Sequence, residues 1–226
     1  MRYFILLVVV FWPLFGQAEE AQRQIVVNAV GSASAAPDMA MVRLGVTHEA
    51  RTAAEAMRGA SEVTAVVLAN IAEAGIEDRD VQTSSLNLSP VWDRGNTSVP
   101  QIRGYVVTTQ LAVRVRALDT LGQFLDLVIS DGANTLNGLS FAITDPAPLE
   151  DTARAEAVRL ARAKAETLAT AAGVTLGPVL SIREGGGSAG PQPLMRGAMM
   201  DAAAVPVATG ELDIRVGVTL VFAIED

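Results

Sequence analysis

Residues 151–179 constrain the fold of this chain more than any other stretch. They read DTARAEAVRLARAKAETLATAAGVTLGPV, an alanine-rich run with regular Arg, Lys and Glu that reaches Gly173 and then becomes strand-like. This composition predicts a long helix with a glycine cap, opened by Asp145 as N-cap and Pro146 at the first helical position. Its apolar stripe comprises Ala153, Ala157, Leu160, Ala161, Leu168 and Ala172. Side chains this small predict close approach to a sheet or to another helix.

The first eighteen residues have the features of a secretory signal peptide. Arg2 precedes an apolar run over residues 3–15, and Gly16-Gln17-Ala18 provides a small-x-small cleavage site. The run is shorter than the roughly 20 residues that span a bilayer. We therefore predict export to the periplasm or cell envelope, cleavage after Ala18 and no stable membrane insertion afterwards. An uncleaved signal anchor is the alternative.

Charge and cysteine content exclude several classes of function. Without residues 1–18, which carry one arginine and no acidic residue, the chain has 16 basic and 25 acidic residues, a net charge of −9. This charge argues against a nucleic-acid partner. The absence of cysteine removes disulfides, thiolate metal sites and cysteine nucleophiles. Residues 19–226 are long enough to bury the core of a single domain.

Two-residue and helical hydrophobic periods alternate along this domain. Strands are predicted at residues 25–30 and 40–46, and the Pro37-Asp38 turn between them favours a hairpin. Thr52 and Glu55 then form a capping box that begins a helix ending near residue 75.

Strands at 81–92 and 105–116 are predicted next and form a long antiparallel hairpin. The remaining elements are a helix at about 119–130, a strand at 136–144, the alanine-rich helix, and strands at 176–183 and 214–224. The order is ββαββαβαββ, with antiparallel sheets and three helices, which predicts the α+β class. Residues 184–210, rich in Gly, Pro and Ala, are predicted to form a flexible loop.

Short motifs in a fixed order extend over nearly all of residues 25–224. They are Val30-Gly31, Ala36-Pro37-Asp38, Thr52 to Ala56, Gly75-Ile76, Val81-Gln82-Thr83, Leu88 with Pro90, Gly104-Tyr105, Val113 to Leu118, Gly132-Ala133-Asn134, Phe141, Ala153-Arg154, Ala163-Lys164-Ala165-Glu166, Ala172-Gly173-Val174 and Leu176-Gly177. In this order they resemble the SIMPL domain family, formerly DUF541, which includes exported bacterial immunogenic proteins and proteins labelled as oxidative-stress defence.

The resemblance implies an α+β fold and a periplasmic or cell-envelope location. For some relatives it also implies assembly of many subunits into a ring or a channel-like particle. It supplies no catalytic residues.

The titratable residues offer two candidate arrangements, and each has a structural reading. His48 is the only histidine and lies beside Glu49, but no nucleophile is near it in the sequence, which favours a structural or surface role. Paired carboxylates occur as Asp78 with Asp80 and as Asp145 with Asp151. Each pair lies at a helix or strand boundary, where aspartate is favoured by caps and turns. We assign no catalytic, cofactor-binding or metal-ligating residue.

Methionines in the predicted loop provide a different candidate. Met195, Met199 and Met200 lie close together and could present thioethers to Cu(I) or react with oxidants. The structural reading is an apolar patch in a flexible segment, because no Cys or His accompanies them.

These observations predict an exported, non-enzymatic envelope protein. The resemblance implies that it works through self-assembly into a homo-oligomer and through binding, with a role in stress defence. The alternative is a protein that binds a small ligand or buffers copper or oxidants through the Met195–Met200 loop. A hydrolase is third, and would require His48 to lie within hydrogen-bond reach of a hydroxyl and a carboxylate.

Overall fold

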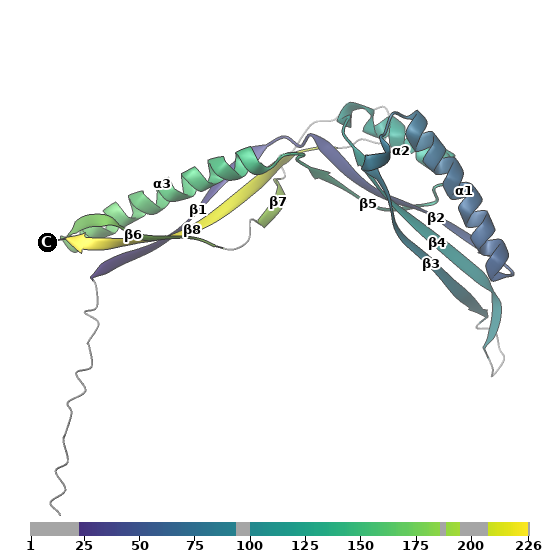
Figure 1. The fold of residues 1–226 in the computed structure, drawn as a ribbon, viewed down its shortest axis with the longest axis horizontal. Helices are drawn as coiled ribbons and strands as arrows, with labels where there is room; N and C mark the ends of the chain where they lie inside the picture. Colours follow the sequence, from purple (N-terminus) through teal and green to yellow (C-terminus); the bar gives the residue numbers. More distant parts are fainter. Residues whose placement is uncertain (1–22, 94–99, 186–188, 195–207, 226) are drawn as a thin grey trace, which may run out of the picture.

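The chain forms two antiparallel sheets that lie end to end in a bent, elongated molecule (Figure 1). This computed structural model describes residues 23–93, 100–185, 189–194 and 208–225. Helices pack on one face of each sheet, which confirms the predicted α+β class with three helices. We refer to the two halves as the terminal unit and the central unit.

The terminal unit is built from both ends of the described chain. Its strands are β1 (Gln24–Ala35), β6 (Thr175–Glu184), β7 (Ala189–Leu194) and β8 (Glu211–Glu225), with the order β1-β8-β6 and β7 paired to β8. Helix α3 (Ala147–Ala172) lies along this sheet (Figure 1). The core between them contains Val27, Val216, Val218, Leu220 and Phe222.

The central unit contains the intervening residues. Its strands are β2 (Met39–Ala50), β3 (Val81–Asp93), β4 (Gln101–Val115) and β5 (Thr135–Ala142), in the order β3-β4-β2-β5. Its helices are α1 (Ala53–Glu73), α2 (Leu121–Ser130) and the short 3₁₀ turns η1 (Asp78–Asp80) and η2 (Leu118–Thr120). Valines and leucines of β2 and β4 pack against both helices, with Phe124 of α2 among them.

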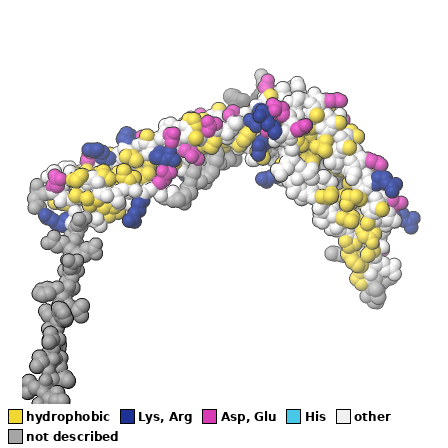
Figure 2. Space-filling view, viewed as in Figure 1, with side chains coloured by type: hydrophobic (Ala, Val, Ile, Leu, Met, Phe, Trp, Pro, Cys, Tyr) yellow, Lys and Arg dark blue, Asp and Glu magenta, His cyan; other side chains and the backbone are white. Residues whose placement is uncertain are grey.

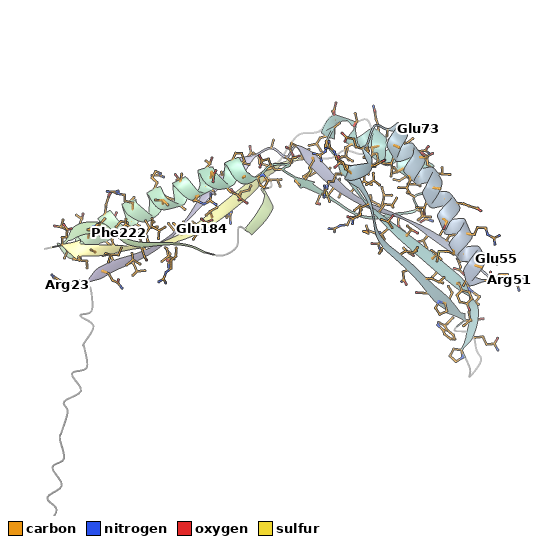
Figure 3. The ribbon with its side chains drawn as sticks, viewed as in Figure 1. Arg23, Arg51, Glu55, Glu73, Glu184 and Phe222 are labelled. Atoms are coloured by element: carbon orange, nitrogen blue, oxygen red, sulfur yellow. The ribbon has the colours of Figure 1, made fainter. Side chains whose placement is uncertain are left out.

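Helix α1 begins where the capping box predicts. The Thr52 hydroxyl accepts a hydrogen bond from the Glu55 backbone N–H, and the Glu55 carboxylate accepts one from the Thr52 N–H, both at 3.2 Å. The helix ends at Glu73, with Ala74 as its C-cap and Gly75 next at φ +83°. Figure 3 labels Glu55 and Glu73 at the two ends of the helix, which extends along most of the central unit.

The packing face of α3 is narrower than the predicted stripe. Its fully buried residues are alanines spaced four apart, at Ala153, Ala157, Ala161, Ala165 and Ala169. Leu168 of the predicted stripe is 46% exposed, and Leu160 is half-buried. The close approach that the alanines predicted is present, because a Cβ on Gly31 of β1 would clash with the α3 backbone at Ala153 and Ala157.

One prediction about a local connection is wrong. β1 and β2 do not form a hairpin: β1 pairs with β8 and β2 pairs with β4 and β5. The segment between them instead carries the chain from one unit to the other, where Asp38 accepts hydrogen bonds from the backbone N–H (2.8 Å) and the hydroxyl (3.1 Å) of Thr144.

Two boundaries also differ from the sequence prediction. The segment 184–210, predicted as one loop, includes strand β7. The N-cap of α3 is Pro146, although the Asp145 carboxylate still accepts a hydrogen bond from the Ala147 N–H at 3.2 Å. The single domain predicted for residues 19–226 stays a prediction. The two sheets have separate core clusters, and a single domain requires that both units unfold together.

Candidate functional site

Strand β3 leaves hydrophobic side chains uncovered. Among the described residues it forms one edge of the central sheet and pairs only with β4, while α1 packs on β2 and β4. On the face that carries α1, three β3 side chains remain open: Leu86 is 58% exposed, Leu88 40% and Trp92 50%. Ile102 of β4, opposite Trp92, is 47% exposed. We call these four residues the edge patch.

The edge patch extends a hydrophobic surface along the central unit. Figure 2 shows hydrophobic side chains gathered along the arm of the molecule that carries β3. No charged residue occurs from Val81 to Trp92. Natural edge strands are usually protected from pairing by charges, bulges or proline. A bulge at Ser84 and the proline at Pro90 supply this protection, so residues 85–89 form the open stretch of β3.

A pocket of about 550 Å³ opens at the other end of the central unit. It lies between the C-terminal end of α1, the end of β4 and the first turns of α2. Ile76, Val115, Phe124 and Leu127 contribute apolar walls. Its charged lining residues are Glu77, Asp80, Arg114 and Arg116.

An ion pair with a buried carboxylate forms one wall of this pocket. Arg116 donates from Nε and Nη2 to the two carboxylate oxygens of Asp80, at 2.7 and 2.8 Å. Asp80 is only 5% exposed, whereas the Arg116 side chain is 42% exposed. The hydrogen bonds from Arg116 hold the pKa of Asp80 below its ordinary value, although burial acts in the opposite direction.

The predicted carboxylate pairs do not act as pairs in the structure. Asp78 is exposed, while Asp80 is engaged with Arg116. Asp151 forms an ion pair with Arg154, which also binds Glu184 of β6 at 2.8 Å, whereas Asp145 accepts from the α3 backbone. Figure 3 labels Glu184 beside α3.

His48 packs between β2 and α1. A Cβ on Gly59 would clash with the His48 ring, so the imidazole fills the space that this glycine leaves. The neighbouring Glu49 binds Arg103 at 2.9 Å. The hydroxyl and carboxylate contacts that a hydrolase would require of His48 are not among the hydrogen bonds of the described residues.

The methionine candidates Met195, Met199 and Met200 lie outside the described residues, and the copper or oxidant role stays a prediction. Within residues 23–93, 100–185, 189–194 and 208–225, no cluster of three His, Cys, Asp or Glu could hold a metal ion. In the same residues, no helix has the length and hydropathy needed to cross a membrane.

Comparison with known proteins identifies the family. A family model named SIMPL, described as "Protein of unknown function (DUF541)", matches residues 25–222. The chain belongs to the SIMPL family. The family prediction made from the ordered motifs is therefore confirmed.

Relatives of this SIMPL chain cover most of its length. A "26 kDa periplasmic immunogenic protein" of Brucella melitensis biotype 1 is 41% identical over 226 residues, covering 94% of this chain and 90% of the relative. The protein of the same name in Brucella abortus strain S19 is 40% identical with the same coverage. "Uncharacterized protein YggE" of Escherichia coli K12 is 29% identical over 217 residues, covering 93% and 87%. None of these names describes an enzyme.

Sequence reasoning identified the elements of both sites but not their environments. Alternation placed Leu86, Leu88 and Trp92 on one face of a strand, without showing that the neighbouring helix leaves that face open. The partner of Asp80 was missed, because Arg116 is 36 residues away and the contact depends on how the ends of β3 and β4 align.

Proposed function

We propose that this SIMPL-family chain is an exported, non-enzymatic envelope protein that acts by self-association and binding. Export rests on the signal-like residues 1–18 and on the word "periplasmic" in the names of the Brucella relatives. The non-enzymatic reading rests on the contacts of Asp80, Asp145 and Asp151 and on the packing of His48 against α1. The main observation in support of self-association is the exposed edge of β3.

The open stretch of β3 favours pairing with a second copy of this chain. Its outward backbone N–H and C=O groups continue the hydrogen-bonding pattern of the sheet, and the edge patch provides apolar surface to bury beside them. Antiparallel pairing of two β3 strands around a twofold axis gives each copy the same contacts. This contact would join two four-stranded sheets into one.

Size measurement of the purified protein tests this proposal. We expect light scattering in line with size exclusion to give a discrete multimer at micromolar concentration. Leu88→Lys should shift it to a smaller species, since a charge would then lie within the edge patch and the open stretch of β3. Ile129→Lys is the matched control, because Ile129 of α2 is 53% exposed and lies outside the edge patch. A concentration-independent monomer, or equal effects of both variants, would contradict self-association through β3.

Export and stress defence have separate tests. Osmotic shock of producing cells should release the protein together with periplasmic markers. The released protein should lack residues 1–18. Retention with the cytoplasm would refute export.

Loss of the gene should increase sensitivity to peroxide, and the wild-type gene should restore survival; unchanged survival would refute the proposed stress role.

A further inference from the structure

The pocket of the central unit has one cationic side chain that no described residue neutralises. Of the charged residues around it, Asp80 is paired with Arg116, and Glu77 is paired with Arg79 at 2.8 Å. Arg114 also lines the pocket. Within the described residues it makes no ion pair or side-chain hydrogen bond. Its charge nevertheless lies close enough to Asp80 to contribute to the lowered pKa of that carboxyl.

Unused hydrogen-bond donors accompany this charge. Arg116 uses Nε and Nη2 on Asp80, and its guanidinium has five N–H donors in total. Gln123 is exposed on α2, lines the same pocket, and makes no side-chain hydrogen bond to the described residues. The charged lining residues balance, Glu77 and Asp80 against Arg114 and Arg116, and this neutral lining differs from the average surface of a protein with a net charge of −8. The unpaired guanidinium of Arg114 and the spare donors of Arg116 and Gln123 favour an anionic group.

The rest of the pocket is suited to an apolar body. Ile76, Val115, Phe124 and Leu127 line it, and Leu127 is 38% exposed. The volume of about 550 Å³ falls within the range of ligand pockets, which are typically apolar with a few polar groups that fix orientation. Inorganic phosphate or acetate would leave these apolar walls without a contact.

We propose that this pocket binds a small organic carboxylate with an apolar chain or ring, whose carboxylate accepts hydrogen bonds from Arg114, Gln123 and the free N–H groups of Arg116. The apolar body lies against Phe124 and Leu127. Guanidinium groups suit this role, because they present planar, paired donors to a carboxylate. The site does not involve the edge patch, so it is independent of self-association.

Calorimetric titration of the purified protein with decanoate, below its micellar concentration, tests the site. We expect saturable binding that weakens as salt is added, because exposed charge interactions are screened. Decanol, which keeps the chain and loses the charge, should bind more weakly, and so should acetate, which keeps the charge and loses the chain. Absent binding of decanoate overturns the proposal, as does equal binding of decanol or acetate.

Two variants separate the pocket from nonspecific attraction. Arg114→Gln should weaken decanoate binding by about tenfold or more, the effect expected for losing a charge-assisted hydrogen bond. Arg43→Gln is the matched control, because Arg43 is also exposed on the central sheet and does not line the pocket. Leu127→Gln should weaken binding of decanoate while leaving the weak binding of acetate unchanged. Equal losses in Arg114→Gln and Arg43→Gln would overturn the assignment.

Discussion

Gly31 lies where β1 passes close to the backbone of α3. A Cβ at this position would lie 2.9 Å from the Cα of Ala157 and would clash with the neighbouring backbone atoms. Because the obstacle is backbone, no change of rotamer can relieve it, and the strand or the helix must move. We therefore expect Gly31→Ala to lower the free energy of unfolding by about 1–3 kcal/mol, measured by urea denaturation.

Gly217 provides the control for this substitution. It lies on β8 opposite Val30, beside the Gly31 pair, and an added Cβ there would meet no atom within 4 Å. Gly217→Ala should therefore leave stability unchanged or raise it slightly, since alanine restricts the unfolded chain. Equal destabilisation by both substitutions would show that the close approach of α3 is not the cause.

Asp80 links stability to pH. Its pKa is lowered in the folded protein by the hydrogen bonds from Arg116, so its contribution is fully present above the pKa of about 4 that an unfolded aspartate has. The contribution is lost as the pH falls through the lower folded pKa. In thermal unfolding, Asp80→Asn should have a lower Tm than the wild type at pH 7, and the difference should shrink below about pH 4.

Asp78→Asn serves as the reference for this titration. Asp78 is exposed two residues away, so its removal should change the Tm little at any pH. A constant difference between wild type and Asp80→Asn from pH 7 to pH 3 would contradict the ionic origin of the effect.

At the scale of elements, the sequence predicts the features that depend on interactions between residues close together in the chain. The capping box of Thr52 and Glu55 begins α1 as predicted, because both hydrogen bonds form within four consecutive residues. The partners of β1 were not predictable in the same way. Its alternation identifies a strand, but pairing with β8 joins Gln24 to Ala223 across nearly the whole chain. The candidate sites have the same limit, since exposure of β3 depends on where α1 packs.

Thr52→Ala tests the cap of α1. Removing the hydroxyl leaves the Glu55 N–H without its acceptor and should lower the free energy of unfolding by about 0.5–2 kcal/mol. Ser61→Ala removes a hydroxyl from an exposed position of the same helix and should be neutral or slightly stabilising, because alanine has the higher helix propensity. The measurement is urea denaturation followed by circular dichroism. Equal losses would indicate that the Thr52 hydroxyl does not act as a cap.

At the scale of the whole molecule, the chain leaves the terminal unit after β1, forms the central unit and returns through α3. Among the described residues, no strand pairing joins the two sheets, and the two large core clusters share no residue. The two crossing segments lie side by side, because Asp38 binds Thr144. A bent molecule joined in this way can present β3 and the pocket on one arm while the other arm remains structurally separate (Figure 1).

Ala161→Leu tests whether the terminal unit and the central unit unfold independently of each other. Ala161 is fully buried between α3 and its sheet, and a larger side chain there should cost about 1–3 kcal/mol. If the units open separately, hydrogen exchange should become faster in α3, β1 and β8 and stay unchanged in α1, β2 and β4. Ala163→Leu, at an exposed position of the same helix, should leave both patterns unchanged. Equal acceleration in both units would instead support the single cooperative domain predicted for residues 19–226, because strain at one end would then open the whole molecule.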